Sequence, residues 1–259
     1  MLAPILHAQQ LLQQARYVVA LTGAGISTPS GIPDFRTRES GLWAESDPSE
    51  VATIQAFRRY PEKFYRWIRP LADKILAAQP NAAHLALKEL ERFGPLRSII
   101  TQNIDMLHTK AGSRVLHELH GHLREAECLT CRQKYNAEGR LQTFISEGII
   151  PLCHHCGDVL KPCVTLFGEQ LPWHALHHAE QEALRCDVML VVGSSLEVAP
   201  AGDLPERAFY NGAKLIMVNF GPTHLDHLAA VVIRADAAEI LPQLAAPFIV
   251  QNCENAPAL

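Results

Sequence analysis

The stretch from Tyr17 to Ser27, Tyr-Val-Val-Ala-Leu-Thr-Gly-Ala-Gly-Ile-Ser, decides the fold of this chain. Its first half is apolar and rich in β-branched residues, which predicts a buried strand. A glycine turn follows, and Gly23 and Gly25 permit the backbone to approach a diphosphate, whose charge the next helix N-terminus favours. By itself, this turn is equally consistent with a tight strand-to-helix connection that binds nothing. An ordinary dehydrogenase is disfavoured, because Thr28 replaces the third glycine of the dinucleotide fingerprint.

The alternation of strands and helices continues along most of the chain. Before the first strand, apolar residues such as Ile5, Leu12 and Ala15 recur at helical spacing. Strands that alternate with helices predict a mostly parallel α/β sheet of the Rossmann-like class. The further predicted strands are 97–101, 187–192 and 214–218, and the predicted helices are 81–93, 103–111, 174–184, 200–211 and 236–244.

Two stretches break this alternation. Residues 37–80 have a helical pattern without a strand signal, and residues 122–160 hold two CxxC pairs. We interpret both as insertions that together form a smaller domain, a helical module plus a zinc-binding module. The segments 1–36, 81–121 and 161–259 are expected to form one discontinuous Rossmann-like domain, which ends in a frayed tail.

The composition excludes several classes of protein. Of 259 residues, 48% are hydrophobic and 19% are charged, which rules out a disordered or collagen-like chain. The formal net charge of −4 supplies no excess of positive charge for general nucleic-acid binding. The longest strongly apolar stretch, Val188–Val192, is far shorter than the roughly 20 residues of a membrane span, and the N-terminus lacks the layout of a secretory signal. We therefore expect a cytoplasmic protein, monomeric by default, with no membrane and no specific nucleic-acid partner.

Four of the seven cysteines form two CxxC pairs, Cys128-x2-Cys131 and Cys153-x2-Cys156, with 21 residues between the pairs. In a reducing compartment, such pairs indicate a metal site before disulfides. Four thiolates at about 2.3 Å suit tetrahedral zinc and leave no open position for a catalytic water, so we predict one structural zinc ion. A redox-active CxxC is the alternative, and it is disfavoured because neither pair opens a thioredoxin-like unit. His154 or His155 also remains available to replace one thiolate.

Several further motifs follow the glycine turn in an order typical of one enzyme family. They resemble the sirtuins, NAD-dependent protein-lysine deacylases, over about residues 15 to 245, and we identify the chain as a member of this family, of the prokaryotic type. The motifs are Gly23-Ala24-Gly25-Ile26-Ser27, Gly31-Ile32-Pro33-Asp34-Phe35-Arg36, Thr101-Gln102-Asn103-Ile104-Asp105 with His108, His120-Gly121, the two CxxC pairs, Phe167-Gly168-Glu169, Gly193-Ser194-Ser195-Leu196 and Val218-Asn219.

The resemblance implies that NAD is a co-substrate and that His120, Asn103 and Asp105 are the catalytic residues. His120 is implied as the general base, a role that suits imidazole because it takes up and releases protons near neutrality. Without the surrounding motifs, His120 would be interpreted as structural or as a metal ligand, and Asn103 as a helix N-cap. The residues implied to bind NAD are Gly23, Ala24, Gly25, Ile26, Ser27, Asp34, Phe35, Arg36, Gln102, Asn103, Ile104, Asp105, Gly193, Ser194, Ser195, Asn219 and Ala237.

The preferred acyl group depends on one pair of positions. Family members that remove succinyl or malonyl groups carry a Tyr and, three residues later, an Arg. The corresponding residues of this chain are Tyr65 and Ile68. Because an Ile cannot make the charge-assisted contacts that a buried carboxylate needs, we expect acetyl or longer apolar acyl groups. A one-residue register shift that brings in Arg66 or Arg69 is the alternative.

The implied function is deacylation of protein lysines, with nicotinamide and O-acyl-ADP-ribose as products. A mono-ADP-ribosyltransferase and a non-catalytic module that binds NAD or ADP-ribose are the alternatives, and the presence of His120 favours deacylation. The partner is an acyl-lysine protein or peptide, which pairs through main-chain hydrogen bonds. The strip implied to carry its lysine stem comprises Val164, Phe167, Gly168 and Glu169.

Overall fold

The larger sheet consists of six strands. The computed structural model describes residues 2–34 and 47–254, with side chains described as far as Val250. The strand order is β3-β2-β1-β7-β8-β9, and all neighbouring pairs are parallel, which confirms the predicted Rossmann-like class. The strands are β1 (Val18–Thr22), β2 (Leu96–Thr101), β3 (Leu116–Glu118), β7 (Val188–Val192), β8 (Lys214–Val218) and β9 (Val231–Ile233).

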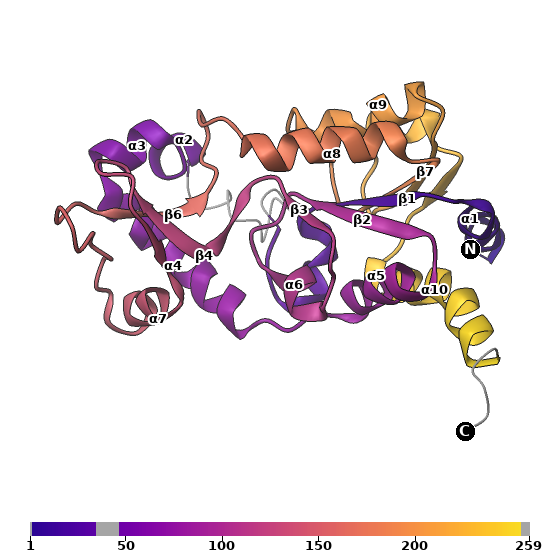
Figure 1. The fold of residues 1–259 in the computed structure, drawn as a ribbon, viewed down its shortest axis with the longest axis horizontal. Coiled ribbons are helices and arrows are strands. Elements are labelled where there is room, and N and C mark those ends of the chain that lie inside the picture. Colours follow the sequence, from indigo (N-terminus) through magenta and orange to yellow (C-terminus); the bar gives the residue numbers. More distant parts are fainter. Residues whose placement is uncertain (1, 35–46, 255–259) are drawn as a thin grey trace.

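Helices cover both faces of this sheet (Figure 1). On one face, α1 (Leu2–Gln14), α5 (Ala82–Phe93) and α10 (Ala237–Glu254) share a core with alternate residues of the strands. On the other face, α8 (Trp173–Arg185) and α9 (Leu204–Tyr210) pack against the remaining strand residues. Because both faces are covered, all five residues of β1 are buried, and this explains why the first four of them are apolar.

A smaller antiparallel sheet lies at one end of the molecule (Figure 1). Its order is β5-β4-β6, and α4 (Pro61–Ala77) and α7 (Glu138–Glu147) share a core cluster with it. The two inserted stretches of the sequence thus contribute to one core, although the exact domain division stays a prediction. The other elements here are β4 (Gly121–Cys128), β5 (Lys134–Asn136), β6 (Leu160–Val164), α2 (Pro48–Val51) and α3 (Ile54–Arg59).

Three predicted helices differ from the structure by more than one residue at an end. The helix predicted over 103–111 begins only at α6 (Leu107–Ala111), because Met106 has a left-handed φ of 62° and Asp105 Oδ1 accepts a hydrogen bond from Leu107 N. The helix predicted over 200–211 begins as a separate 3-10 turn, and α10 runs ten residues past its predicted end at 244. Within the described part of the chain, no helix has the length and apolar character needed to cross a membrane.

The strand order changes direction between β1 and β7. After β1 the next strand of the sheet is β2 on one side, and after β7 the next is β8 on the other side. From the carboxyl ends of β1 and β7, the chain therefore continues toward opposite edges of the sheet. Ligands of open α/β sheets bind in the crevice at such a point. Four 3-10 turns complete the connections: η1 (Ala24–Ile26), η2 (Thr28–Ser30), η3 (Ala201–Asp203) and η4 (Asp226–Leu228).

Candidate active site

The two glycine loops touch each other at this crevice. Gly25 N donates a hydrogen bond to Gly193 O at 2.8 Å, and Gly23 N donates to Val192 O at 3.0 Å. Gly193 has a φ of +60°, and a Cβ on it would lie 2.3 Å from Ile26 N. A Cβ on Gly25 would lie 2.8 Å from Gly193 Cα. Glycine is thus required at both positions by the contact between the loops, in addition to any ligand.

A cavity of about 650 Å³ opens beside these loops. This volume lies within the range of small-molecule sites, which is roughly 300–1,000 Å³. The wall also includes part of α4 and the segment 164–169, so it joins the larger sheet to the smaller module. The predicted site residues in the wall are Gly23, Ala24, Gly25, Asp34, Ile68, Gln102, Asn103, Ile104, His120, Val164, Phe167, Gly168, Glu169, Gly193, Ser194, Ser195 and Asn219.

His120 lies in this wall, between β3 and β4. Its Nδ1 lies 2.8 Å from Gln102 O. Because a carbonyl oxygen only accepts hydrogen bonds, Nδ1 carries the proton, and the neutral ring has Nε2 as its basic nitrogen. Burial lowers the pKa of His120, and the hydrogen bond to Gln102 partly opposes this effect. The ring is therefore neutral at neutral pH and able to accept a proton.

Asn103 and Asp105 occupy different places in a buried network. Asn103 Nδ2 donates to Gly23 O at 3.0 Å and to Ser27 Oγ at 3.1 Å. Ser27 Oγ in turn donates to Asp105 Oδ2 at 2.6 Å. Burial raises the pKa of Asp105, while the Ser27 and Leu107 hydrogen bonds oppose the rise. Asn103 lines both the main cavity and an adjoining pocket of about 20 Å³, whereas Ser27 and Asp105 line only the smaller pocket.

Three of the predicted polar residues are linked across the ends of neighbouring strands. Gln102 Nε2, after β2, donates to Ser194 Oγ at 2.9 Å. Asn219 Nδ2, after β8, donates to Ser194 O at 3.1 Å. These bonds hold the loop after β7 between its neighbours, as expected for a ligand site at the carboxyl ends of parallel strands.

Some predicted contacts are not in the cavity wall as far as the structure describes it. Ile26 is fully buried, and Ala237 packs in the core of the larger sheet. The Tyr65 side chain is also buried and lies outside this wall, and its hydroxyl donates to Leu160 O at 2.5 Å. Its predicted place beside the acyl group stays a prediction. Phe35 and Arg36 lie outside the described residues.

The sequence analysis missed the apolar side chains of α4 that accompany Ile68 in the wall. Phe64, Trp67, Ile68 and Leu71 follow the i, i+3, i+4, i+7 spacing of one helix face, and all four line the cavity. This helical spacing is the feature of the sequence from which a shared apolar face could have been predicted. Phe220 and Pro222, which follow Asn219, also line the cavity and carried no recognisable motif.

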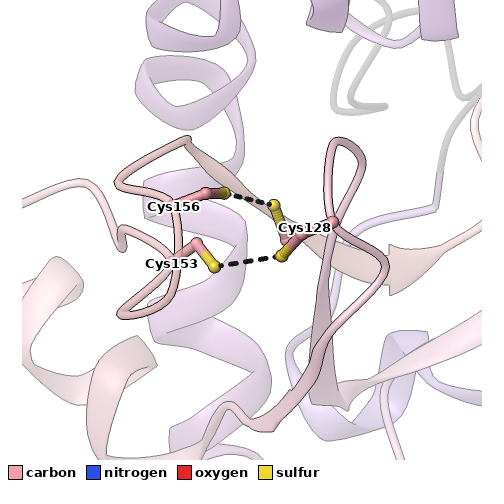
Figure 2. A group of neighbouring side chains, drawn as sticks. Cys128, Cys153 and Cys156 are labelled. Atoms are coloured by element: carbon pink, nitrogen blue, oxygen red, sulfur yellow. Dashed lines mark hydrogen bonds between the residues drawn. The ribbon is translucent and has the colours of Figure 1, made fainter.

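The four cysteines of the CxxC pairs come together in the smaller module (Figure 2). Their sulfurs all lie within 4.8 Å of one another, with 3.4 Å between Cys128 and Cys156 and 3.5 Å between Cys131 and Cys153. Tetrahedral zinc with Zn–S bonds of about 2.3 Å separates its thiolates by about 3.8 Å, so the cluster fits zinc. The separations are too long for disulfides, whose S–S bond is about 2.05 Å. This confirms the predicted four-cysteine set.

Loops at the switch point of a parallel sheet, a basic imidazole in the adjoining cavity and an appended four-thiolate cluster together define a nucleotide-binding α/β enzyme with a structural metal module. The family model described as "Sir2 family" matches residues 23–200, which is more than half of the chain. The chain therefore belongs to the Sir2 family, as its motifs predicted.

Individual relatives agree with this assignment over nearly the whole chain. The "NAD-dependent protein deacylase 2" of Archaeoglobus fulgidus is 47% identical over 93% of this chain and 94% of its own length. The "NAD-dependent protein deacylase" of Thermococcus kodakarensis is 46% identical, over 92% of this chain and 93% of its own length. A solved structure described as Sir2Af2 bound to a myristoylated histone peptide has a TM-score of 0.83 and 40% identity, and the match covers 98% of this chain and 100% of that chain.

Proposed function

We propose that this protein is an NAD-dependent protein-lysine deacylase that produces nicotinamide, the free lysine and O-acyl-ADP-ribose. One observation carries the proposal: His120 shares a cavity wall with both glycine loops and with the segment 164–169. A dinucleotide held by the loops and an acyl-lysine lying along the segment would both reach the imidazole. The names of the relatives, which describe NAD-dependent deacylases and deacetylases, support the same activity.

The chain must do two things for this reaction. The carbonyl oxygen of an acyl-lysine is a poor nucleophile, so the cavity has to position it and exclude water. NAD supplies an electrophilic ribose carbon when nicotinamide departs. Asn103, fixed by Gly23 and Ser27, orients the ribose and carboxamide groups. The acyl oxygen bonds to the ribose carbon as nicotinamide leaves. His120 accepts the proton of a ribose hydroxyl at Nε2, and this hydroxyl attacks the acyl carbon. The lysine amine then leaves with a proton, and one water molecule adds to complete O-acyl-ADP-ribose.

The zinc site supports this chemistry only through structure. Cys128, Cys131, Cys153 and Cys156 would hold the ion, and four thiolates complete its coordination. The bound ion crosslinks the turn after β4 to the loop before β6 and takes no part in a reaction step. Because these cysteines must stay reduced, we also propose a cytoplasmic location.

The wall formed by α4 favours apolar acyl groups. Phe64, Trp67, Ile68 and Leu71 line the cavity, and the wall contains no Lys or Arg among the described residues. Arg69 is not available for a carboxylate, since its guanidinium donates to Ile145 O and Ser146 O. Acetyl and longer apolar chains therefore fit this wall better than succinyl. The relative that binds a myristoylated peptide supports this preference.

The acyl-lysine substrate would lie between the two parts of the chain. The wall combines residues of the sheet domain that we propose, such as Ser194, with residues of the smaller domain, such as Ile68. Related structures are described as complexes with myristoylated and propionylated peptides. The partner that we propose is accordingly an extended peptide segment that carries an acylated lysine.

The decisive experiment is mass spectrometry of an acetyl-lysine peptide incubated with NAD. We expect nicotinamide, deacetylated peptide and O-acetyl-ADP-ribose, all dependent on the acetyl group. His120→Ala should lower kcat by about 100-fold or more, as loss of a general base typically does, and should leave NAD binding intact. His7→Ala, at an exposed position on α1, is the matched control.

Two results would overturn the proposal. Nicotinamide release without an acylated peptide, together with ADP-ribose attached to protein, would indicate a mono-ADP-ribosyltransferase. NAD binding without nicotinamide release under any of these conditions would indicate a binding module.

A further inference from the structure

Lys161 places an ammonium group in the interior of the smaller module. The residue lies in β6 and is 6% exposed. Its Nζ donates to Val164 O at 2.6 Å and to Pro162 O at 3.2 Å, and it lies 2.9 Å from Glu169 Oε2. Burying a charge is costly unless the charge is paired and hydrogen-bonded, and here three acceptors match the three donors of an ammonium. None of the catalytic roles described above uses this group.

Glu169 extends the same network into a turn. Its Oε2, the atom paired with Lys161, also accepts a hydrogen bond from Leu166 N at 2.8 Å. Glu169 N donates to Leu166 O at 3.0 Å, and Gly168 between them has a left-handed φ of +84°. The carboxylate therefore closes the turn from Leu166 to Glu169, and Lys161 holds the carboxylate.

The segment that this network shapes borders the active site. Val164, Leu166, Phe167 and Gly168 all line the cavity, whereas Lys161 is not among the described residues of the wall. The backbone of the segment is also tied to the general base, because Thr165 N donates to His120 O at 2.8 Å.

The far end of the segment is attached to the helical module. Phe167 N donates to Ala52 O at 2.9 Å, and Ile54 N donates to Phe167 O at 3.0 Å. The segment is thus anchored at His120, at the residues before α3 and, through Val164 O and Glu169, at Lys161. Removal of Lys161 would leave the outer anchors in place and release the turn between them.

We infer that Lys161 is a positioning residue for the acyl-peptide substrate. Through Val164 O and the Glu169 carboxylate, it fixes the conformation of residues 164–169, over which the lysine stem is proposed to pass. The inference rests on the proposed function, because it assumes an acyl-peptide substrate. The loops proposed to hold NAD are anchored by other contacts, such as Gly25 N to Gly193 O, so Lys161 should affect the peptide and not the dinucleotide.

The test compares Lys161→Met with Lys161→Arg and with Lys134→Met, which removes an exposed charge from the same small sheet. In Lys161→Met, we expect the KM for an acetyl-lysine peptide to rise about tenfold, because misplaced substrate-positioning groups cost this much or more. The KM for NAD should change less than about twofold, because Lys161 shapes the segment that binds the peptide and not the loops proposed to bind NAD. Lys161→Arg keeps the charge and should restore most of the peptide affinity, and Lys134→Met should match the wild type.

A direct binding measurement separates positioning from general stability. Fluorescence polarisation of a labelled acetyl-lysine peptide, in the presence of ADP-ribose, should show the same loss of affinity in Lys161→Met. A lower melting temperature and lower kcat with unchanged peptide affinity would overturn the inference, as would equal increases in both KM values. If Lys161→Met does not fold, Glu169→Gln tests the same contact and should also weaken peptide binding selectively. Failure of the wild type to release nicotinamide would instead refute the proposed function, and the peptide-binding comparison would still decide the role of Lys161.

Discussion

His84 and His108 form a pair of buried imidazoles, with ring centroids 4.9 Å apart. His108 Nε2 bonds Thr22 Oγ1, and His84 Nδ1 accepts a hydrogen bond from Asn81 N. His84 Nε2 and His108 Nδ1 are buried and have no hydrogen-bond partner among the residues that the structure describes. Burial lowers the pKa of His84 to about 4 and, together with the nearby His84, that of His108 to about 3. Both rings are therefore neutral in the folded protein at neutral pH.

This pair predicts a loss of stability in mild acid. The unfolded chain binds protons at these histidines near pH 6.5, whereas the folded chain does not until about pH 4 or below. The free energy of unfolding should therefore be highest above pH 6.5 and should fall below it by about 1.4 kcal/mol per pH unit for each histidine. Urea unfolding between pH 7.5 and 4.5 measures this slope.

A single substitution checks the source of the slope. His84→Gln removes one titrating group, so its stability should depend less steeply on pH than that of the wild type, whatever its absolute stability. His117 and His122, whose pKa values burial also lowers, add to the slope in both proteins. Parallel slopes for the two proteins would show that His84 does not contribute.

For single residues, the sequence predicted the chemical type of a site residue better than the orientation and hydrogen bonds of its side chain. The motifs indicated His120 as the base, but the tautomer depends on Gln102 O, a main-chain atom that no side-chain pattern reports. The motifs also did not report that Ser27, 76 and 78 residues earlier in the chain, bonds both Asn103 and Asp105.

Among the elements, α4 is the one that we propose sets the acyl preference, and Ile68 is the position to change. In the wild type, kcat/KM should be at least about tenfold higher for acetyl and myristoyl peptides than for a succinyl peptide, because one charge-assisted hydrogen bond is worth about 1.5–3 kcal/mol. Ile68→Arg should raise the ratio of succinyl to acetyl turnover by about tenfold for the same reason. Kinetics with the three peptides measure both effects.

The matched control for this variant is Ile68→Met, which conserves volume and apolar character and should leave the order of preference unchanged. A wild-type enzyme that turns over the succinyl peptide fastest would contradict the assignment of the α4 wall.

Continuous apolar strands were predicted well, and the shortest strands were not. The strand predicted over 214–218 has the same bounds as β8, because four of its five residues form a buried apolar run. β3 and β9 have three residues each, too few for a periodic signal. The bond of the Tyr65 hydroxyl to Leu160 O, 95 residues further along the chain, was not predicted, because helical spacing alone does not report such a contact.

For the whole molecule, the four-cysteine cluster predicts that chelation acts through folding. Removing zinc should loosen the smaller module, since metal binding to such sites is coupled to folding. Activity should be lost together with resistance to proteolysis near residues 128–156. Limited proteolysis and peptide turnover, followed in the same chelator titration, measure this.

Two cysteine variants provide the comparison. Cys131→Ser removes one ligand and should reproduce the effect of the chelator, whereas Cys163→Ser, outside the cluster, should not. Activity lost at a chelator concentration that leaves the proteolysis pattern unchanged would show that the metal has a role other than a structural one.

The sequence predicted the sheet domain and the two insertions, but it predicted only partly how these segments pack together. Two insertions were recognised because they interrupt the strand and helix alternation. Their shared core, in which Tyr65 of α4 packs edge-on against Phe144 of α7, depends on contacts across about 80 residues of chain. Local patterns do not determine such packing, so the shape of the cavity between the parts was not predictable.

The hydrogen bond from His120 to the carbonyl of Gln102 has a consequence for how this enzyme tolerates change. The atom that sets the protonation pattern of the imidazole belongs to the peptide unit, so no replacement of side chain 102 deletes it. A substitution of Gln102 removes the side chain that bonds Ser194, while the base keeps its tautomer. Variants at position 102 therefore change this part of the cavity wall and leave the proton of His120 on Nδ1.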